Sequence, residues 1–395
     1  MRKEASVFLA VFCMIALPVF SADIKLTGMT RTNLTVATET GDFLLAEQTL
    51  QTAMDGYGKK SGFHVSPAVS VSVDGEPRFA VREAYVDLLT GFADVRIGKQ
   101  AVVWGKAEGF FITDVVSPQD LSNFILADFS EIRIGIPAVR TQKYLGKISL
   151  DVVWIPFFVP TVFPEPGSPW HTAEMGAFTT YDAQMGNLSD SEFFGKLAYF
   201  GSGFDAELMA GYARDDQPVL EGNAPLLQTR YQRFTVIGGS VGKPIGPVLA
   251  RAEAVVYLDR AFTTRPSPTE FESSRKAEIV GLVGLDWNLG GIDFSAQYSG
   301  RYISDYAETL VLPEYRQTAS VRARDSYLGD ALVAEFFAYV GLDPYDALLR
   351  PSVSYTIEDG VILKAEADIF LGDSSGQYGR YRDNTLFSTS ISWYF

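Results

Sequence analysis

Cysteine is almost absent from this chain of 395 residues, since the only one is Cys13. No disulfide can form within the chain, and zinc sites built on cysteine pairs are excluded. Cys13 follows the bulky Phe12 rather than the small residue that precedes a lipid-modified cysteine. An acyl anchor is therefore not expected.

Histidine is nearly as scarce, with only His64 and His171. Enzymes that use a nucleophile need a base and an orienting group beside it, and the sequence offers only Ser66, two residues from His64. A hydroxyl at that spacing is commonplace on a strand. We expect no catalytic residue, no metal site and no cofactor, and a hydrolase built on carboxylates alone is the least favoured alternative.

Basic residues are too few for a nucleic-acid partner. The chain has 33 Lys and Arg against 48 Asp and Glu, a formal charge of −15, and loss of Arg2, Lys3 and Glu4 with a leader would make it −16. Such an acidic chain repels phosphates.

Long apolar runs are also missing, because after the first twenty residues no stretch approaches the length that a membrane helix needs. The chain is nevertheless 47% hydrophobic and 13% aromatic. The hydrophobic and aromatic side chains are therefore not arranged in membrane-spanning helices.

The N-terminus has the pattern of a secretory leader. Arg2 and Lys3 precede an apolar run from Val7 to Phe20, and small residues follow. Cleavage after Ser21 places small side chains at the two positions that favour them. We expect a signal peptide at 1–21 and a mature domain at 22–395, with a retained anchor helix as the alternative.

Segments of about ten residues alternate strictly between apolar and polar side chains. In the segment 292–302, the apolar Ile292, Phe294 and Tyr298 alternate with Asp293 and Gln297. The segment 361–371 repeats the pattern. Strands of a barrel alternate in this way when one face meets lipid and the other meets water. A soluble sandwich alternates too, so other features must decide.

Three features favour an outer-membrane barrel. The chain ends in an aromatic stripe with Ile391, Trp393 and Phe395 on one face, which resembles the insertion signal of Gram-negative barrels. Short turns alternate with long connections at 106–131, 157–190, 213–230 and 260–275, and aromatic residues lie at strand ends.

The expected fold is all-β, a single transmembrane antiparallel β-barrel. About sixteen strands are visible, and the up-and-down order requires two more, near 43–52 and 309–321. We expect an even number of about 14 to 18 strands.

The region 82–156 resembles a known family. It reads R-E-A-Y-V-D-L, then R-I-G-K-Q-A-V-V-W-G-K, then D-V-V-S-P-Q-D. This resembles a family of porin-like outer-membrane proteins of mostly unassigned function, marked by R-x-G-x-Q-x-x-x-W-G and D-x-x-x-P-x-D. The matching positions are Glu83, Tyr85, Asp87, Arg96, Gly98, Gln100, Trp104, Gly105, Asp114, Pro118 and Asp120. The resemblance implies a barrel and no particular substrate.

The same region brings charges of both signs onto one face. Glu83, Tyr85 and Asp87 alternate on one strand, and Asp94 and Arg96 alternate on its hairpin partner. Across the ladder these groups can pair and hold each other at the wall of a pore, or form salt bridges without any role in selectivity. The full set of candidate pore-lining residues is Glu83, Tyr85, Asp87, Asp94, Arg96, Gln100, Lys106, Asp114, Asp120, Asp293, Arg301, Lys364, Glu366 and Asp368.

The segment 106–130 is too apolar for a connection in water. Within it, Ser117, Pro118 and Asp120 have the pattern of a helix start. We expect an inward-folded segment with a short helix that narrows or plugs the barrel, with an external flap as the alternative.

These features together predict a porin-like channel for passive diffusion of small hydrophilic solutes, in the outer membrane. Its expected partners are outer-membrane lipids, lipopolysaccharide-type headgroups, the barrel-assembly machinery and the solutes themselves. An adhesin or structural barrel is the alternative. The sequence specifies neither the substrate nor the oligomeric state.

Overall fold

The computed structural model describes residues 23–395 except 74, 76, 125, 127, 128, 130, 172–186 and 225. The expected signal peptide and its cleavage site lie outside the described residues. The strands are, in chain order, β1 (Asp23–Ala37), β2 (Phe43–Tyr57), β3 (Ser61–Ser72), β4 (Arg78–Leu89), β5 (Asp94–Gln100), β6 (Ile136–Leu145), β7 (Ile148–Ile155), β8 (Glu192–Phe200), β9 (Asp205–Arg214), β10 (Val219–Asn223), β11 (Leu226–Arg230), β12 (Arg233–Ile245), β13 (Val248–Thr264), β14 (Glu270–Leu289), β15 (Ile292–Ile303), β16 (Tyr315–Tyr327), β17 (Leu332–Leu342), β18 (Tyr345–Glu358), β19 (Val361–Gly372) and β20 (Leu386–Tyr394).

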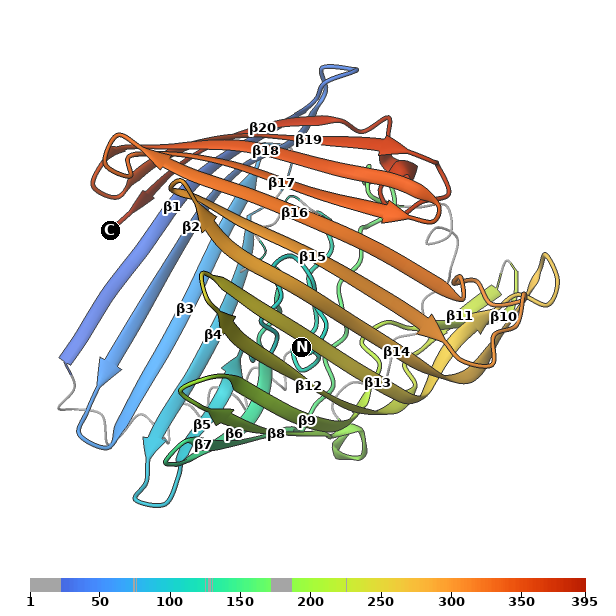
Figure 1. Cartoon of the computed structure of the whole chain (residues 1–395), viewed down its shortest axis with the longest axis horizontal. Helices are drawn as coiled ribbons and strands as arrows, with labels where there is room; N and C mark the ends of the chain where they lie inside the picture. The colour runs from blue at the N-terminus through green and yellow to red at the C-terminus, as the bar shows by residue number, and fades with distance from the viewer. Residues whose placement is uncertain are drawn as a thin grey trace.

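The strands close into one antiparallel barrel of 18 strands (Figure 1). Consecutive strands pair from β1 to β9, β9 pairs with β12, and the pairing continues to β20, which returns to β1. The expected even number is confirmed at the top of its range. β2 and β16 overlap the two segments that the up-and-down order requires.

The two ends of the barrel differ in the length of their connections. One end, here the turn end, carries the short turns at 58–60, 90–93, 146–147, 201–204, 246–247, 290–291, 328–331 and 359–360. The other, here the loop end, carries long connections such as 101–135, 156–191, 215–232 and 373–385. In barrels of this class the short turns face the periplasm.

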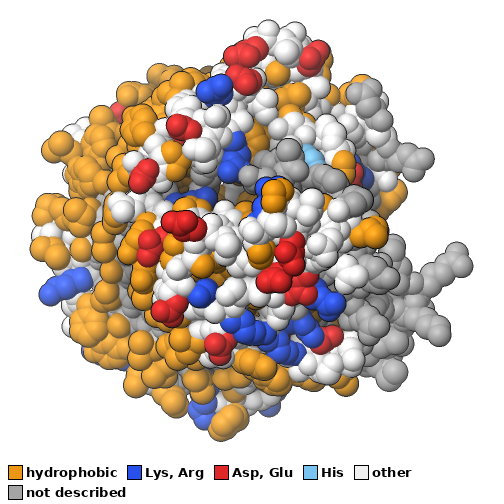
Figure 2. Space-filling view, turned by 90° about the vertical axis from the view of Figure 1, so that its right-hand side faces the viewer, with side chains coloured by type: hydrophobic (Ala, Val, Ile, Leu, Met, Phe, Trp, Pro, Cys, Tyr) orange, Lys and Arg blue, Asp and Glu red, His pale blue; other side chains and the backbone are white. Residues whose placement is uncertain are grey.

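Alternation separates the two faces of the wall as expected. On β19 the side chains of Leu363 and Leu371 are 42% and 46% exposed, whereas Asp368 on the other row is fully buried. Figure 2 looks onto the loop end, where hydrophobic side chains follow much of the outline and charged side chains gather nearer the middle. The apolar row therefore faces outward and the polar row faces the lumen.

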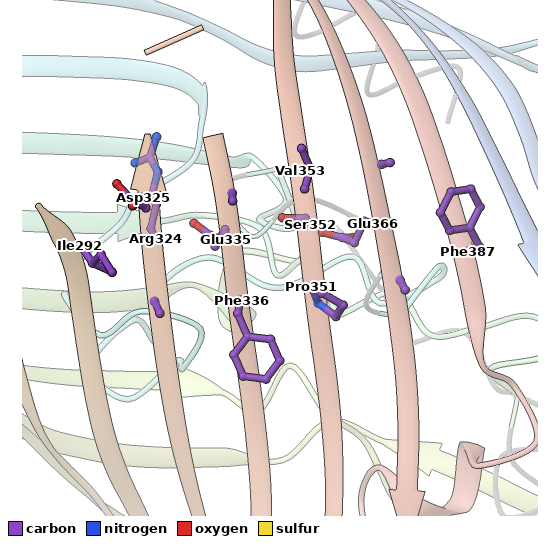
Figure 3. Close-up of a pocket in the computed structure, with 14 residues that line it drawn as sticks. Ile292, Arg324, Asp325, Glu335, Phe336, Pro351, Ser352, Val353, Glu366 and Phe387 are labelled. Atoms are coloured by element: carbon purple, nitrogen blue, oxygen red, sulfur yellow. The ribbon is translucent and has the colours of Figure 1, made fainter. Parts of the chain in front are cut away.

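A shallow depression of about 520 Å³ crosses the outer face of β15 to β20 (Figure 3). Small residues such as Ala334 and Ala365 lie between the larger Ile292, Phe336 and Phe387. Outward positions of unequal size make this surface uneven.

Two connections differ from the sequence-based expectation. The connection 213–230 contains the hairpin of β10 and β11, which pairs with β14 at Gly222 and Asn223. The stretch 260–275 is mostly strand, because β13 runs to Thr264 and β14 begins at Glu270. The register of β13 and β14 shifts between Tyr257 and Arg260, and polar residues predominate beyond this shift, so the strict alternation that marks the other strands is absent there.

The connection between β5 and β6, residues 101–135, folds into the barrel and is visible inside it in Figure 1. We call it the inner segment. Its residues Val102, Trp104, Ile112 and Val116 are buried against the wall. The external-flap alternative is therefore not supported.

The short helix expected at Ser117 is wrong for the described residues of the inner segment. The backbone N–H of Asp120 donates to Ile132 O at 2.7 Å, and that of Leu121 donates to Val162 O at 2.8 Å. The Ser117 hydroxyl accepts from Val102 N at 2.8 Å instead of capping a helix. Distant partners thus satisfy the groups that a local helix would use. No helix among the described residues is long and apolar enough to span a membrane.

Candidate functional site in the barrel lumen

The inner rows of β2, β3, β4 and β5 form a compact charged group. Arg96 donates to both carboxylate oxygens of Asp87, at 2.7 and 2.9 Å, which confirms the pairing expected across this hairpin. The Arg96 guanidinium lies 3.7 Å from the centre of the Tyr85 ring, and His64 stacks on the same ring at 5.1 Å. His64 Nδ1 lies 2.7 Å from Asp55 Oδ1. The charges of this group are held against the wall by one another.

Glu83 and Asp94 lie on the same inner row but have other roles. Glu83 accepts a hydrogen bond from the backbone N–H of Ala101 at 2.8 Å. It therefore fixes the point at which the inner segment leaves β5. Asp94 lies at the turn end of β5, opposite Gln142 of β6.

The R-x-G-x-Q part of the motif has a packing explanation. Gly98 has φ +136°, and a Cβ there would lie 2.3 Å from the carbonyl oxygen of Ala84. Only glycine fits both the conformation and the space. Gln100 is fully buried, and its side-chain amide donates to Ala138 O at 3.1 Å. Gln100 thus joins β5 to β6 rather than facing open lumen.

The W-G part joins the inner segment to the wall. Trp104 is 2% exposed, and its indole N–H donates to Asp151 of β7 at 3.1 Å. Its backbone N–H donates to Asp114 Oδ1 at 3.1 Å. A Cβ on Gly105 would lie 2.8 Å from the Cβ of Asp114. The W-G pair of the first motif therefore packs against Asp114, the first residue of D-x-x-x-P-x-D.

Asp114 is the buried acid of the inner segment. It is 5% exposed and accepts from Arg133 Nε at 2.5 Å. The Arg133 guanidinium lies 5.1 Å from the ring centres of both Phe111 and Phe129. Burial raises the pKa of the Asp114 carboxyl above its ordinary value, although Arg133 and the Trp104 N–H oppose this. The group holds the inner segment together.

The inner segment crosses the barrel and is hydrogen-bonded to β13 and β15. Glu253 accepts from the backbone N–H of Lys106 at 2.7 Å and from the Thr113 hydroxyl at 2.6 Å. The amide of Gln297 bonds the backbone of Glu108 twice, at 2.8 and 3.3 Å. These wall groups replace the partners that a strand would supply.

The tip of the inner segment reaches the opposite wall. Glu108 pairs with Arg322 of β16 at 3.0 Å, and Arg322 also pairs with Glu335 of β17 at 2.6 Å. The Tyr339 hydroxyl donates to Gly109 O at 3.1 Å. β16 lies diametrically across from β5, at an equal number of strands in either direction. The segment thus spans the full width of the lumen.

Apolar packing fills the lumen on one side of the inner segment. Its buried residues contact inward-facing side chains of β6, β7, β8, β9, β12, β13 and β14, among them Val153, Phe194, Phe234, Val236 and Leu282. Lys106 Nζ also pairs with Glu207 of β9 at 3.0 Å. This side of the lumen is a packed core.

A second cluster lies toward the loop end. Phe124 of the inner segment contacts Trp170 and Tyr381, with ring centres 5.5 and 4.9 Å apart. Trp170 also lies 6.0 Å from Phe370 of β19. Three connections that are distant in sequence therefore meet over the lumen.

The expected residues of β15 and β19 lie in separate groups. Asp293 accepts from Asn288 at 2.8 Å near the turn end. On β19, Glu366 pairs with Lys364 at 2.9 Å and with Arg350 of β18 at 2.8 Å, and Asp368 pairs with Arg350 at 2.6 Å.

Arg301 differs from the other inner arginines. It lies directly opposite Arg316 of β16. Its Nε and one terminal nitrogen are buried without a hydrogen-bond partner among the described residues, and the nearest carboxylate oxygen, of Glu278, is 3.5 Å from Nε.

The structure thus gathers most of the expected site residues into separate groups rather than one site. Asp120 lies at the surface of the inner segment, where it accepts from Ser122 at 2.6 Å. The wall groups that hold the inner segment were not expected from the sequence; the most important are Glu253, Gln297, Arg322 and Tyr339. They occupy alternate positions of strands that were expected, and nothing in the sequence indicates what they contact.

The expected insertion-signal residues lie on the outer row of β20. Ile391, Trp393 and Phe395 are 45%, 51% and 47% exposed. Phe395 exchanges backbone hydrogen bonds with Gly28 at 2.8 and 2.9 Å, at the seam between β20 and β1. A Cβ on Gly28 would lie 2.6 Å from the Phe395 ring. The last residue therefore packs across the seam.

The comparisons with known proteins concern the fold. Residues 42–233 match a family described as a protein of unknown function, DUF1302. No curated protein matches the chain. Similar solved structures include OccAB3 of Acinetobacter baumannii, with 10% identity over 95% of this chain and 99% of that chain and a TM-score of 0.57. OccK5 (OpdH) of Pseudomonas aeruginosa has 12% identity over 94% and 98%, with a TM-score of 0.57.

OccK2 (OpdF) of Pseudomonas aeruginosa, solved in complex with glucuronate, has 11% identity over 95% and 98% and a TM-score of 0.56. These neighbours are outer-membrane porins of Gram-negative bacteria. At such identity the likeness shows the fold alone.

Proposed function

We propose that this protein is an outer-membrane channel through which small hydrophilic solutes diffuse passively. The observation that carries the proposal is a closed barrel with an apolar outer face and a polar inner face, crossed by an inner segment that is bonded to both walls. A barrel of this size has a lumen that wall side chains alone do not fill. A pore narrowed by the inner segment is the function that suits this geometry best.

The proposal includes the parts that serve export and assembly. We propose removal of residues 1–21, recognition of Ile391, Trp393 and Phe395 by the barrel-assembly machinery, and contact of the loops with lipopolysaccharide-type headgroups. The signature R-x-G-x-Q-x-x-x-W-G supports membership of the porin-like family that it resembles, because its residues join the wall to the inner segment. The charged inner rows are proposed to line the pore.

Planar lipid bilayers test the proposal directly. The purified, folded protein is expected to give stepwise conductance, and liposomes that contain it are expected to swell in solutions of small sugars and amino acids. An inserted protein that conducts no ions and passes no solute would refute the channel and favour an adhesin or structural barrel.

A further inference from the structure

One part of the inner face carries several uncharged polar side chains. They lie on β20 and β1, which pair at the seam of the barrel, and on β18, which β19 separates from β20. We call this set the hydroxyl wall; it consists of Asn33, Thr35, Ser354, Ser388, Ser390 and Ser392. Its members alternate with outward-facing residues, and the Thr35 and Ser388 hydroxyls lie 3.0 Å apart.

A cavity of about 250 Å³ separates the hydroxyl wall from the inner segment. Leu126 of the inner segment lines it, together with Arg31, Lys364 and Glu366 of the wall. The opposite side of the lumen holds the apolar cluster, in which Val153 and Val236 are fully buried. Space for a solute therefore lies beside the hydroxyl wall rather than at the centre of the barrel.

The charged groups around this cavity neutralise one another. Arg31 makes two hydrogen bonds to Glu131 of the inner segment, at 3.1 and 3.2 Å. Lys364 and Arg350 both contact Glu366, and Arg350 also contacts Asp368. Each cation thus has a carboxylate within ion-pair distance, and the cavity offers a permeating ion little net field.

We propose that solutes pass between the hydroxyl wall and the inner segment, and that this passage favours small uncharged polyhydroxyl compounds over charged compounds of equal size. The inference rests on the proposed channel function. Hydroxyl and amide groups both donate and accept hydrogen bonds, so they replace the water that a sugar or polyol sheds. A charged solute loses hydration in the same place without gaining a free counter-charge.

Single-cysteine blocking tests the route. A Cys13→Ser background has no other cysteine, so Ser390→Cys provides one thiol on the hydroxyl wall. A bulky, water-soluble methanethiosulfonate reagent, added to open channels in a bilayer, is expected to abolish most of the Ser390→Cys conductance. Because the reagent acts after folding, a folding defect cannot produce this result.

Two matched variants serve as controls. Leu363→Cys places the thiol on the outward row of β19, one residue from Lys364, which pairs with Ser390 in the ladder. Ser240→Cys places it on β12, where Ser240 is buried beside Glu207. Neither is expected to respond. Channels that conduct but are unaffected at Ser390→Cys would overturn the inference while leaving the channel function intact.

Liposome swelling tests the preference with three solutes on one carbon frame. Glucose is uncharged, glucosamine is a cation and gluconate is an anion. The swelling rate for each solute is divided by the rate for the same solute in liposomes that contain a non-selective diffusion pore. Glucose is expected to have the highest ratio of the three. Faster entry of gluconate or glucosamine would overturn the preference, and entry of none of the three would overturn the channel function itself.

Discussion

Two inner arginines of β13 and β15 have opposite energetic roles. Arg260 bonds Asp215 at 2.6 Å and also contacts Glu278, and both acids are buried. Arg301 faces Arg316 and leaves two nitrogens without hydrogen bonds. Like charges directly opposite each other destabilise a sheet, whereas an arginine between two buried carboxylates is hard to remove.

We therefore expect Arg260→Gln to lower the free energy of unfolding by about 3–5 kcal/mol, because it leaves buried carboxylates without a counter-charge. Arg301→Gln should change it by less than about 1 kcal/mol, since relief of the like-charge contact with Arg316 offsets loss of the ion pair with Glu278. Urea unfolding in detergent micelles or lipid vesicles measures both. A larger loss for Arg301→Gln than for Arg260→Gln would contradict this assignment.

Gly98 is the glycine of the motif with the strictest requirement. Gly98→Ala should lower the free energy of unfolding by about 3 kcal/mol, through its positive φ and the contact with the Ala84 carbonyl. Gly195→Ala on β8 is the matched control, because a Cβ there meets nothing within 4 Å. If the two variants are equally stable in the heat-modifiability assay, β4 and β5 must move apart to accept the added methyl group.

Among contacts between single residues, the sequence predicts those that join the two strands of one hairpin. Asp87 and Arg96 follow from alternation and a short turn. Glu253 and Thr113 lie 140 residues apart, and no local pattern joins them. The roles of Gln100 and Trp104 as links to the next strands depend on packing that one sequence does not reveal.

The inner segment is an element without a regular secondary structure, held by the wall. Its apolar composition predicts that it avoids water, and its position inside the barrel follows. The helix expected at Ser117 is wrong because capping patterns describe isolated helices, while here Val162 and Ile132 supply the backbone partners. The wall groups that hold the segment were not predicted for the same reason, because their partners are distant in the sequence.

Removing one wall group should loosen the inner segment. Glu253→Ala leaves the N–H groups of Lys106 and Thr113 and the Thr113 hydroxyl without their acceptor, a cost of about 1–3 kcal/mol. We expect larger and noisier open-channel currents in bilayers. Ser299→Ala, on the inner row of β15, is the control, and currents alike in both variants would show that the segment does not depend on Glu253.

For the whole molecule, alternation, turn spacing and the aromatic C-terminus predict the barrel and its even number of strands. They succeed because the two solvents, lipid and water, impose one rule on every strand. The rule weakens at the loop end of the two longest strands, β13 and β14, where the sequence predicts a loop instead.

The charge of the whole chain predicts weak cation selectivity. The acidic excess attracts cations, but inner charges are largely paired, as Asp87 and Arg96 show. A small reversal potential of cation-selective sign is expected under a potassium chloride gradient, and it should fade as salt rises because screening shortens to about 3 Å at 1 M. Clear anion selectivity would mean that Arg96, Lys99 and Lys106 control the narrow point.

The final strand should be needed for assembly as a whole. Deletion of Phe395, or its replacement by Asp, is expected to reduce the amount of heat-modifiable, membrane-inserted protein severalfold while export continues. Phe387→Leu, on the same outward row, is a conservative control. Normal insertion of the deletion variant would exclude Phe395 from the signal.

The seam between β1 and β20 joins the first described residues to the last, and Arg31 and Ser392 meet across it although 361 positions separate them in the chain. The ring cannot close without β20, so a product that lacks this strand has two open strand edges and no closed circumference. Such edges are templates for aggregation. An open pore therefore requires a chain that carries both closing strands, and loss of either strand removes the pore rather than widening it.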